Sequence, residues 1–194
     1  MLFASLAISM LGQAQDTGEQ FYKFKVGTRW VLESAEGGRL TTVTIKVVRV
    51  EESRVTVESS EMRPNRKEPK VETLVWSVND GYLIWSEVKG EKTKDVFRLY
   101  KVGSKKGDTW KSPWGGGSDE VEVTHLGTEE VEVPAGKFAD AVHVQMARSV
   151  KMGDQEVRMA VDFFLVPNVG LVKMELSSAK SKSTVLLKEI KKAE

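Results

Sequence analysis

Residues 71–88 read VETLVWSVNDGYLIWSEV, and this stretch decides the fold class. Apolar and polar residues largely alternate on both sides of Asn79-Asp80-Gly81, as they do in the strands of an antiparallel sheet. Asp80 and Gly81 both tolerate positive φ angles, so they favour a tight hairpin turn. Each face of this hairpin carries large apolar side chains. That pattern favours either a central place in a two-layer core or a face that lines a ligand cavity.

The same two-residue period recurs through nearly the whole chain after Asp16. The further strands that it predicts are residues 28–34, 41–51, 54–60, 96–102, 120–126, 128–133, 141–150, 156–166, 171–177 and 184–190. About ten short strands at near-regular spacing predict an all-β fold, or a β-rich fold with a minor helix near residues 16–23 or at the C-terminus. The expected architecture is a strongly curved antiparallel sheet, an open barrel or a two-layer β arrangement.

Two phrases near the C-terminus mark chain reversals: VPAGKF at residues 133–138 and VPNVGLVK at residues 166–173. In each phrase the proline ends a strand, because it cannot donate a ladder hydrogen bond, and the glycine permits the turn. In the second phrase either Asn168 or Gly170 supplies the positive φ. The residues expected at structural turns across the chain are Gly27, Gly81, Gly107, Pro134, Gly136, Pro167 and Gly170.

A short pattern occurs twice, as Gly27-x-x-Trp30 and Gly107-x-x-Trp110. The glycine lets the chain turn, and the tryptophan that follows fills the end of a β-core. The repetition has two readings: two similar halves of one sheet, or a chance match of short segments.

Residues 2–11, LFASLAISML, form an apolar run that is too short to cross a bilayer as a helix. Gly12-Gln13-Ala14 follows with small residues at the two positions that a signal peptidase reads. No Lys or Arg precedes the run, and the alternative is a buried N-terminal strand or helix. We expect residues 1–14 to be a signal peptide cleaved near Ala14, and residues 15–194 to be a single β domain that is periplasmic or secreted.

The composition excludes several classes of protein. The formal net charge of the 194 residues is +1, so no global field attracts nucleic acid or an anionic membrane. The chain has no cysteine, which excludes disulfides, Cys-based zinc sites and a lipid anchor at a cleavage-site cysteine. Its two histidines are His125, expected to be partly buried, and His143, expected to face solvent. No spacing selects a third ligand for them, so we predict no metal and no cofactor.

Catalytic motifs are absent from the sequence. It has no Gly-x-Ser-x-Gly nucleophile elbow, no catalytic cysteine and no phosphate-binding glycine loop. The acidic pairs Glu51-Glu52 and Glu129-Glu130 occupy neighbouring strand positions, which point to opposite faces and do not converge. We therefore predict no catalytic residues. A hydrolase whose carboxylates come together from distant strands stays open as an alternative.

The candidate binding residues are aromatic. Trp76, Tyr82 and Trp85 lie on the hairpin, and Trp110 and Trp114 lie in a glycine-rich segment, residues 103–119, that we expect to be a long loop. The loop tryptophans either bind a sugar or an apolar partner, or fold back as a lid over the core.

The order of the Gly-x-x-Trp pair, VPAGKF and VGLVK resembles a family of small exported bacterial β-proteins that is described only as a domain of unknown function. Members of that family look related in fold to the LolA-type lipoprotein carriers of the Gram-negative periplasm. The resemblance implies a curved sheet with an apolar cavity, and it implies no catalytic residues. The chain departs from the family pattern at Leu165 and Val166, before Pro167, and at Ala141, where a cysteine is common.

Three hypotheses follow from the sequence. The first is a non-enzymatic envelope protein that binds an apolar small molecule, a lipid or an envelope protein in or beside a curved sheet. The second is a structural or adhesive module that acts through Trp110 and Trp114. The third is the hydrolase with fold-assembled carboxylates.

Overall fold

The computed structural model describes residues 18–36, 39–89, 92–114, 119–152, 155–179 and 181–193. Within these ranges the regular elements are one 3₁₀ turn, η1 (Glu19–Phe21), and twelve β-strands. The strands are β1 (Arg29–Glu36), β2 (Arg39–Val50), β3 (Arg54–Met62), β4 (Lys70–Asn79), β5 (Tyr82–Lys89), β6 (Lys92–Lys101), β7 (Thr109–Pro113), β8 (Glu120–Val133), β9 (Gly136–Met152), β10 (Gln155–Val166), β11 (Gly170–Ser177) and β12 (Lys182–Lys191). The predicted all-β class is confirmed, and the leader assigned to residues 1–14 lies outside the described residues.

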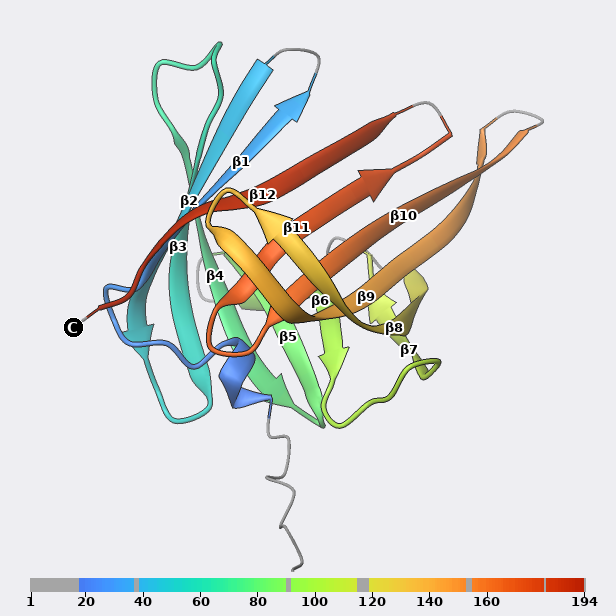
Figure 1. Cartoon of the computed structure of the whole chain (residues 1–194), viewed down its shortest axis with the longest axis horizontal. Coiled ribbons are helices and arrows are strands. Elements are labelled where there is room, and N and C mark those ends of the chain that lie inside the picture. Colours follow the sequence, from blue (N-terminus) through green and yellow to red (C-terminus); the bar gives the residue numbers. More distant parts are fainter. Residues whose placement is uncertain are drawn as a thin grey trace, which may run out of the picture.

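All twelve strands belong to one antiparallel sheet, in which every two neighbours along the chain except β6 and β7 are hydrogen-bonded neighbours. β1 also pairs with β12, so the sheet curls round until the first and last strands meet (Figure 1). Among the described strands, only β6 and β7 adjoin without a backbone ladder, and we call this junction the seam. The result is a nearly closed barrel, which confirms the strongly curved antiparallel sheet expected from the sequence.

Two segments differ from the predicted strands. Residues 120–126 and 128–133 form the single strand β8, because Gly127, at φ 114°, shifts the register with β9 without ending the pairing. Thr109–Pro113 form β7, which pairs with β8, although the sequence predicted a loop there. The flanking Lys, Gly and Pro residues are typical of loops, so the sequence pattern did not indicate the short strand around Trp110.

Side chains of β7 bridge the seam in place of a ladder. The Arg98 N–H donates to Ser112 Oγ over 2.8 Å, and Trp110 Nε1–H donates to the Arg98 carbonyl over 2.9 Å. The Ser112 hydroxyl donates in turn to the Pro113 carbonyl over 3.0 Å. Ser112 is fully buried and Trp110 is 6% exposed, so water does not compete for these bonds.

The two halves of the chain, β1–β6 and β7–β12, begin with the same turn. Gly27 and Gly107 have φ angles of 93° and 94°. Three backbone hydrogen bonds form around each turn, and they match one for one. In the first half they run from Gly27 N to Val47 O (2.9 Å), Thr28 N to Lys25 O (3.1 Å) and Val47 N to Thr28 O (2.9 Å). In the second half they run from Gly107 N to His125 O (2.8 Å), Asp108 N to Lys105 O (3.0 Å) and His125 N to Asp108 O (2.9 Å). These matched bonds favour two similar sheet halves over a chance match.

η1 covers one end of the barrel, which we call the η1 end (Figure 1). Phe21 packs edge-on against Tyr100, with ring centroids 5.1 Å apart, and the Asn168 N–H donates to the Gln20 carbonyl over 2.6 Å. Because strand direction alternates, the turns that follow even-numbered strands lie at this end, except the β8–β9 turn, which folds back over the outer face. Each turn that follows an odd-numbered strand lies at the opposite end, which we call the far end.

The two proline-glycine phrases form turns. The first joins β8 to β9, and the second joins β10 to β11 at the η1 end. Among the turn residues, the positive φ angles are Asp80 49°, Gly81 76°, Gly136 136°, Asn168 61° and Gly170 89°. The Trp30 indole Nε1–H donates to the Val169 carbonyl over 2.7 Å, so the first Gly-x-x-Trp is tied to the second phrase.

The β8–β9 hairpin bends away from the barrel wall and crosses the outside of β11 (Figure 1). Its tip reaches β12, where the Ala135 N–H donates to the Leu187 carbonyl over 3.1 Å. Val131 and Val133 are buried by this fold-back, at 5% and 7% exposed. The hairpin therefore adds a second layer over part of the outer face.

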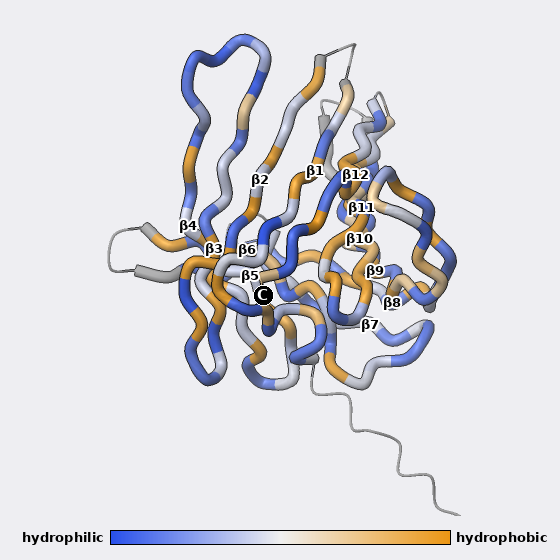
Figure 2. The backbone as a smooth tube through the Cα atoms, turned by 60° about the vertical axis from the view of Figure 1, so that its left-hand side comes forward, coloured by the Kyte–Doolittle hydropathy of each residue, from blue (hydrophilic) through white to orange (hydrophobic). Residues whose placement is uncertain are grey.

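Hydrophobic and hydrophilic residues alternate along the strands (Figure 2), and burial follows the same period. In β8, Val121 and Val123 are buried while Glu120 and Glu122 are exposed. The large side chains that are fully buried include Phe163, Leu83, Leu99 and Met146, drawn from both halves of the barrel. Across the described ranges, no helix has the length and apolar character needed to cross a membrane.

Candidate functional site

Trp76 and Trp85 lie on the inner face of the barrel. They stand in a row with Val55 and Phe97, each residue directly opposite the next on β3 to β6. Directly opposed residues share one face of an antiparallel sheet, and Val55 is fully buried. Trp76 stacks on Trp85 at 5.6 Å, and Trp85 meets Phe163 of β10 at 6.3 Å across the interior. The face of the hairpin that carries the tryptophans therefore belongs to the core.

The interior around this row is filled. A cavity of about 10 Å³ is lined by Trp30, Leu32, Ile45, Trp76, Trp85 and Leu171. That volume is about the space of one water molecule. At this position the apolar cavity that the resemblance implied is reduced to that small space, because three indole rings fill the interior. The Trp76 indole N–H is buried here without a hydrogen-bond partner among the described residues.

Toward the far end, the inner face becomes accessible. Its half-buried apolar side chains are Val43, Leu74, Trp85, Phe97, Met174 and Val185. Leu176 of β11 is 40% exposed, although it stands opposite Val161 of β10, which is buried. The opposed wall carries charge instead, since Glu61 and Glu72 share the inner face of β3 and β4. The far end thus presents an apolar wall on β11 and β12 and a mixed wall on β2 to β6, where apolar side chains lie beside the two carboxylates.

The other three candidate aromatics lie apart from this surface. Trp110 is on β7 and buried, with its indole nitrogen bonded at the seam, and Tyr82 lies 6.5 Å from it. Trp114 is half-buried under the Arg148 guanidinium, 4.8 Å from its ring centroid. The picture of Trp110 and Trp114 as paired anchors on a surface loop is wrong, because Trp110 packs into the barrel wall.

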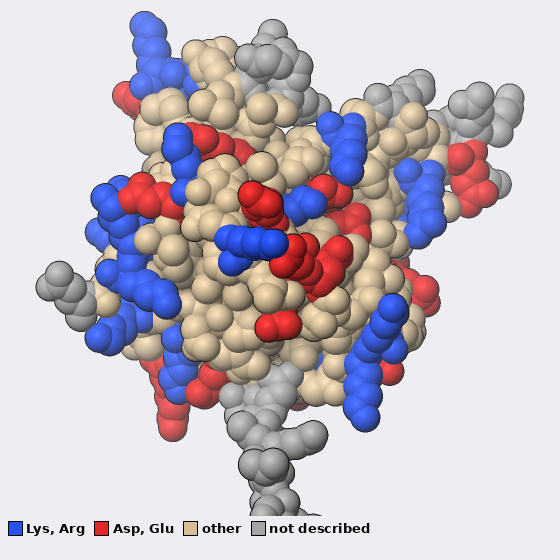
Figure 3. Space-filling view, in the orientation of Figure 1, with Lys and Arg blue, Asp and Glu red and all other residues tan. Residues whose placement is uncertain are grey.

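A polar network that no sequence motif predicted covers the outer face of β8 to β11. His143 Nδ1 lies 2.6 Å from Glu129 Oε1, and His143 Nε2 lies 2.8 Å from Asp162 Oδ1. The His143 ring stacks on Phe164 at 4.3 Å, and Lys173 Nζ lies 4.7 Å from the centroid of Phe164. Figure 3 shows Asp and Glu side chains gathered near the centre of this face, with Lys and Arg among and around them.

The two central groups of the network favour their charged forms. Burial alone lowers the pKa of His143, but the hydrogen bond and charge of Asp162, together with Glu129, outweigh burial and raise that pKa above 6.5. Burial alone raises the pKa of Asp162, but hydrogen bonds from His143 and Gln145 outweigh it and lower that pKa below 3.8. His143 lies on the outer face, the side that the sequence predicted, but it is only 17% exposed because the carboxylates and Phe164 partly cover it.

This arrangement is poorly suited to acid–base catalysis. Both ring nitrogens of His143 contact carboxylates, which leaves neither nitrogen to take a proton from a substrate. His125 is 6% exposed inside the barrel, with its Nδ1 3.0 Å from Ser104 Oγ. Within the described residues, no group of three or more His, Asp or Glu side chains is placed to hold a metal ion.

Two solved structures share the architecture. One is a presumed exported protein with a YmcC-like fold from Bacteroides fragilis, with a TM-score of 0.59 and 17% identity, over 87% of this chain and 97% of that one. The other is a presumed lipoprotein from Parabacteroides distasonis, with a TM-score of 0.58 and 16% identity, over 86% of this chain and 96% of that one. The likeness shows a common fold. No protein-family model and no curated protein matches the sequence.

The descriptions of these two proteins mention neither an enzymatic activity nor a lipoprotein-carrier function. The resemblance to a family of exported proteins of unknown function agrees with them, while the likeness to LolA-type carriers gains no support. What the sequence missed is the outer network, whose members come from β8, β9 and β10. The one local signal was that His143 and Gln145 share a strand face, and so do Asp162 and Phe164.

Proposed function

We propose that the protein is a non-enzymatic envelope protein that binds the apolar part of a ligand against the inner face of the barrel at the far end. The observation that carries the proposal is Leu176, a large apolar side chain that is 40% exposed on an inward-facing strand position. Solvent-exposed apolar surface inside a concave fold is typical of a binding surface. The apolar leader and the likeness to presumed exported proteins support the envelope location.

The far end is the accessible one. At the η1 end, η1 packs on Tyr100, and at mid-height the three tryptophans leave space for about one water molecule. A ligand therefore enters from the far end and rests on the tryptophans, with Trp85 and Phe97 half-buried at the base.

The two inner walls favour an amphipathic ligand. On β11 and β12 the ligand meets Met174, Leu176 and Val185. On β3 and β4 it meets Glu61, which pairs with Arg63, and Glu72, which pairs with Lys70. An acyl chain or another apolar body packs on the first wall, while a polar head group lies against the second, where the charges are already compensated.

The carrier function implied by the LolA-type resemblance is one form of this proposal, with a lipid chain as the ligand. In this form the ligand lies against the inner face at the far end rather than in the middle of the barrel, which the tryptophans fill. The absence of catalytic motifs and the occupied nitrogens of His143 support a binding role over the hydrolase alternative.

A fluorescence titration tests the proposal. The mature domain is titrated with N-phenyl-1-naphthylamine and then with palmitate as a competitor. We expect saturable probe binding, displacement by palmitate and a change in tryptophan emission from Trp85. Leu176→Glu should weaken probe binding by about tenfold or more, because the apolar contact of a leucine side chain is worth about 1.5–3 kcal/mol.

Val71→Glu is the matched control. Val71 lies at the same end and is 54% exposed, but it is opposite Ser60 on the outer face. It should leave the affinity unchanged. Absence of saturable binding, or an equal loss in both variants, would overturn the proposal. Native mass spectrometry of protein purified from its own envelope then identifies the natural ligand.

A further inference from the structure

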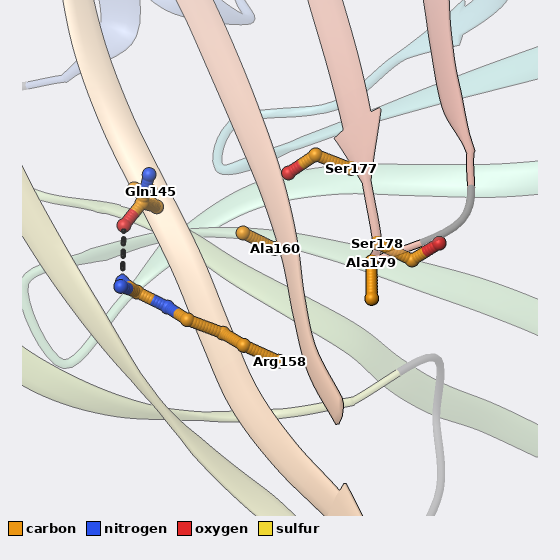
Figure 4. Close-up of a pocket in the computed structure, with 6 residues that line it drawn as sticks. All are labelled: Gln145, Arg158, Ala160, Ser177, Ser178 and Ala179. Carbon is orange, nitrogen blue, oxygen red and sulfur yellow. Dashed lines mark hydrogen bonds between the residues drawn. The ribbon is translucent and has the colours of Figure 1, made fainter. Parts of the chain in front are cut away.

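A second, chemically different site lies on the outer face of β9, β10 and β11. It is a groove of about 440 Å³ (Figure 4), and its lining residues are Gln145, Arg158, Ala160, Ser177, Ser178 and Ala179. Its size is in the range of small-molecule sites. Its lining is about half polar and offers one guanidinium, one amide and two hydroxyls, which are hydrogen-bonding groups that the apolar wall at the far end lacks.

Arg158 is held in place by a chain of polar contacts. Its Nη2–H donates to Gln145 Oε1 over 3.1 Å, and Gln145 Nε2–H donates to Asp162 Oδ1 over 2.9 Å. The same Asp162 oxygen lies 2.8 Å from His143 Nε2, and His143 Nδ1 lies 2.6 Å from Glu129. Asp162 is 13% exposed and His143 is 17% exposed, so the base of the chain is largely shielded from water. The Gln145 amide is thereby fixed with its oxygen toward Arg158.

This support leaves most of the guanidinium available. Arginine carries five N–H donors in a planar fork that matches a carboxylate in a bidentate manner. One of these donors is used by Gln145, and Arg158 is itself exposed (Figure 4). Ala160 forms the floor of the groove, and its small side chain leaves room beside the fork, while the Ser177 hydroxyl lies on the far wall.

The surrounding charges favour a ligand with a single negative charge. Among the described residues Arg158 forms no ion pair, whereas Glu175 is paired with Lys173 at 2.8 Å and with Lys182 at 3.0 Å. Two carboxylates lie close to the guanidinium: Asp162 is joined to it through Gln145, and Glu156 shares its face of β10. A dianion such as phosphate would meet these carboxylates at higher cost.

We propose that this groove binds a small monocarboxylate that carries neighbouring hydroxyl or amide groups, with its carboxylate on Arg158 and its polar groups on Gln145 and Ser177. A sugar acid and the C-terminus of a short peptide both supply this chemistry. The site is independent of the apolar surface at the far end, because it lies on the opposite face of the sheet.

NMR titrations of ¹⁵N-labelled protein test the assignment, with D-glucuronate, N-acetyl-L-alanine, D-glucose and inorganic phosphate as probes. We expect saturable shifts of the amides of Ala160, Ser177 and Ala179 with glucuronate, at a dissociation constant of about 1 mM or tighter. Glucose, which lacks the carboxylate, should bind at least about tenfold more weakly. If N-acetyl-L-alanine binds as well as glucuronate does, the site accepts small monocarboxylates in general. If only glucuronate binds, the site is specific for a sugar acid.

Variants of Arg158 separate the contribution of its planar guanidinium to ligand affinity from that of its positive charge. Arg158→Ala should lower glucuronate affinity by about tenfold or more, and Arg158→Lys should recover only part of it, because lysine keeps the charge without the fork. Arg49→Ala is the matched control, because Arg49 is an exposed arginine that pairs with Glu51 beside the β2–β3 turn. Leu176→Glu should leave glucuronate binding intact even if the far-end proposal fails. No saturable shift with either carboxylate, tighter binding of phosphate, or equal effects of Arg158→Ala and Arg49→Ala would overturn the inference.

Discussion

Replacing Ser112 with alanine should weaken the barrel at its seam. Ser112 Oγ is the acceptor for the Arg98 N–H at 2.8 Å, and Ser112 is fully buried. Alanine removes the acceptor and leaves the Arg98 N–H without a partner in a place that water does not reach. An unsatisfied buried donor costs about 1–3 kcal/mol. We therefore expect the free energy of unfolding to fall by that amount.

Two measurements check this magnitude. Urea denaturation followed by tryptophan fluorescence gives the free energy of unfolding, and the midpoint should fall with little change in slope. For a chain of this size, each kcal/mol lowers the melting temperature by about 2–4 °C. Hydrogen exchange should also show that the Arg98 amide loses protection more than the amides of β1, which pairs on both sides.

Ser34→Ala is the matched control. The Ser34 hydroxyl lies 3.3 Å from that of Ser183, and both side chains are half-buried, so water can replace the bond. Its cost should stay within about 0.5 kcal/mol. If Ser112→Ala is equally mild and the Arg98 amide keeps its protection, the seam is not held by this side chain and the reasoning fails.

Two further predictions concern the outer network and the Gly-x-x-Trp turn. The pKa of His143 is raised by folding, so its contribution to stability is fully present below pH 6.5, its ordinary value, and is lost as the pH rises through the higher folded value. The pKa of Asp162 is lowered, so its contribution is present above pH 3.8 and is lost as the pH falls through the lower folded value. Unfolding measured at a series of pH values should show the plateau between these limits, and His143→Gln should remove the decline on the alkaline side; an unchanged profile would contradict this. Trp30→Phe deletes the donor to the Val169 carbonyl and should cost about 1–3 kcal/mol in urea denaturation, so a variant as stable as the parent would show that this bond does not contribute.

Local features of the sequence were enough for most of the strands and for the turns, but they missed β7 and divided β8 in two. Trp76 and Trp85 lie at equal distances from the Asp80-Gly81 turn, so a two-residue hairpin turn already predicts that they stand opposite each other. Closure of the sheet was not predictable in the same way. It depends on β1 meeting β12 at the other end of the chain, and strand period contains no information on such distant pairing.

The same contrast between local and distant pairing applies to the candidate sites. Trp76 and Trp85 were identified from one hairpin, and the structure brings them together. The outer network needs His143 and Asp162 in register across β9 and β10, with Glu129 placed beside them by the bend in β8. A shift of one residue in any of these strands would turn its side chain to the other face, so composition and motif spacing could not place it.

The internal repeat explains why the barrel closes differently at its two junctions. Trp30 and Trp110 occupy matching positions after matching glycine turns, and the residues two places later are Leu32 and Ser112. Leu32 stands opposite Leu187 where β1 and β12 form a ladder. Ser112 instead accepts the Arg98 N–H across the seam, where no ladder forms.

Between β1 and β12, many backbone hydrogen bonds hold the barrel closed. At the seam, closure depends on the side chains of Trp110 and Ser112. The seam should therefore be the first junction to open under denaturant. Its position halfway along the chain means that this opening separates the two similar halves while β1 stays paired with β12.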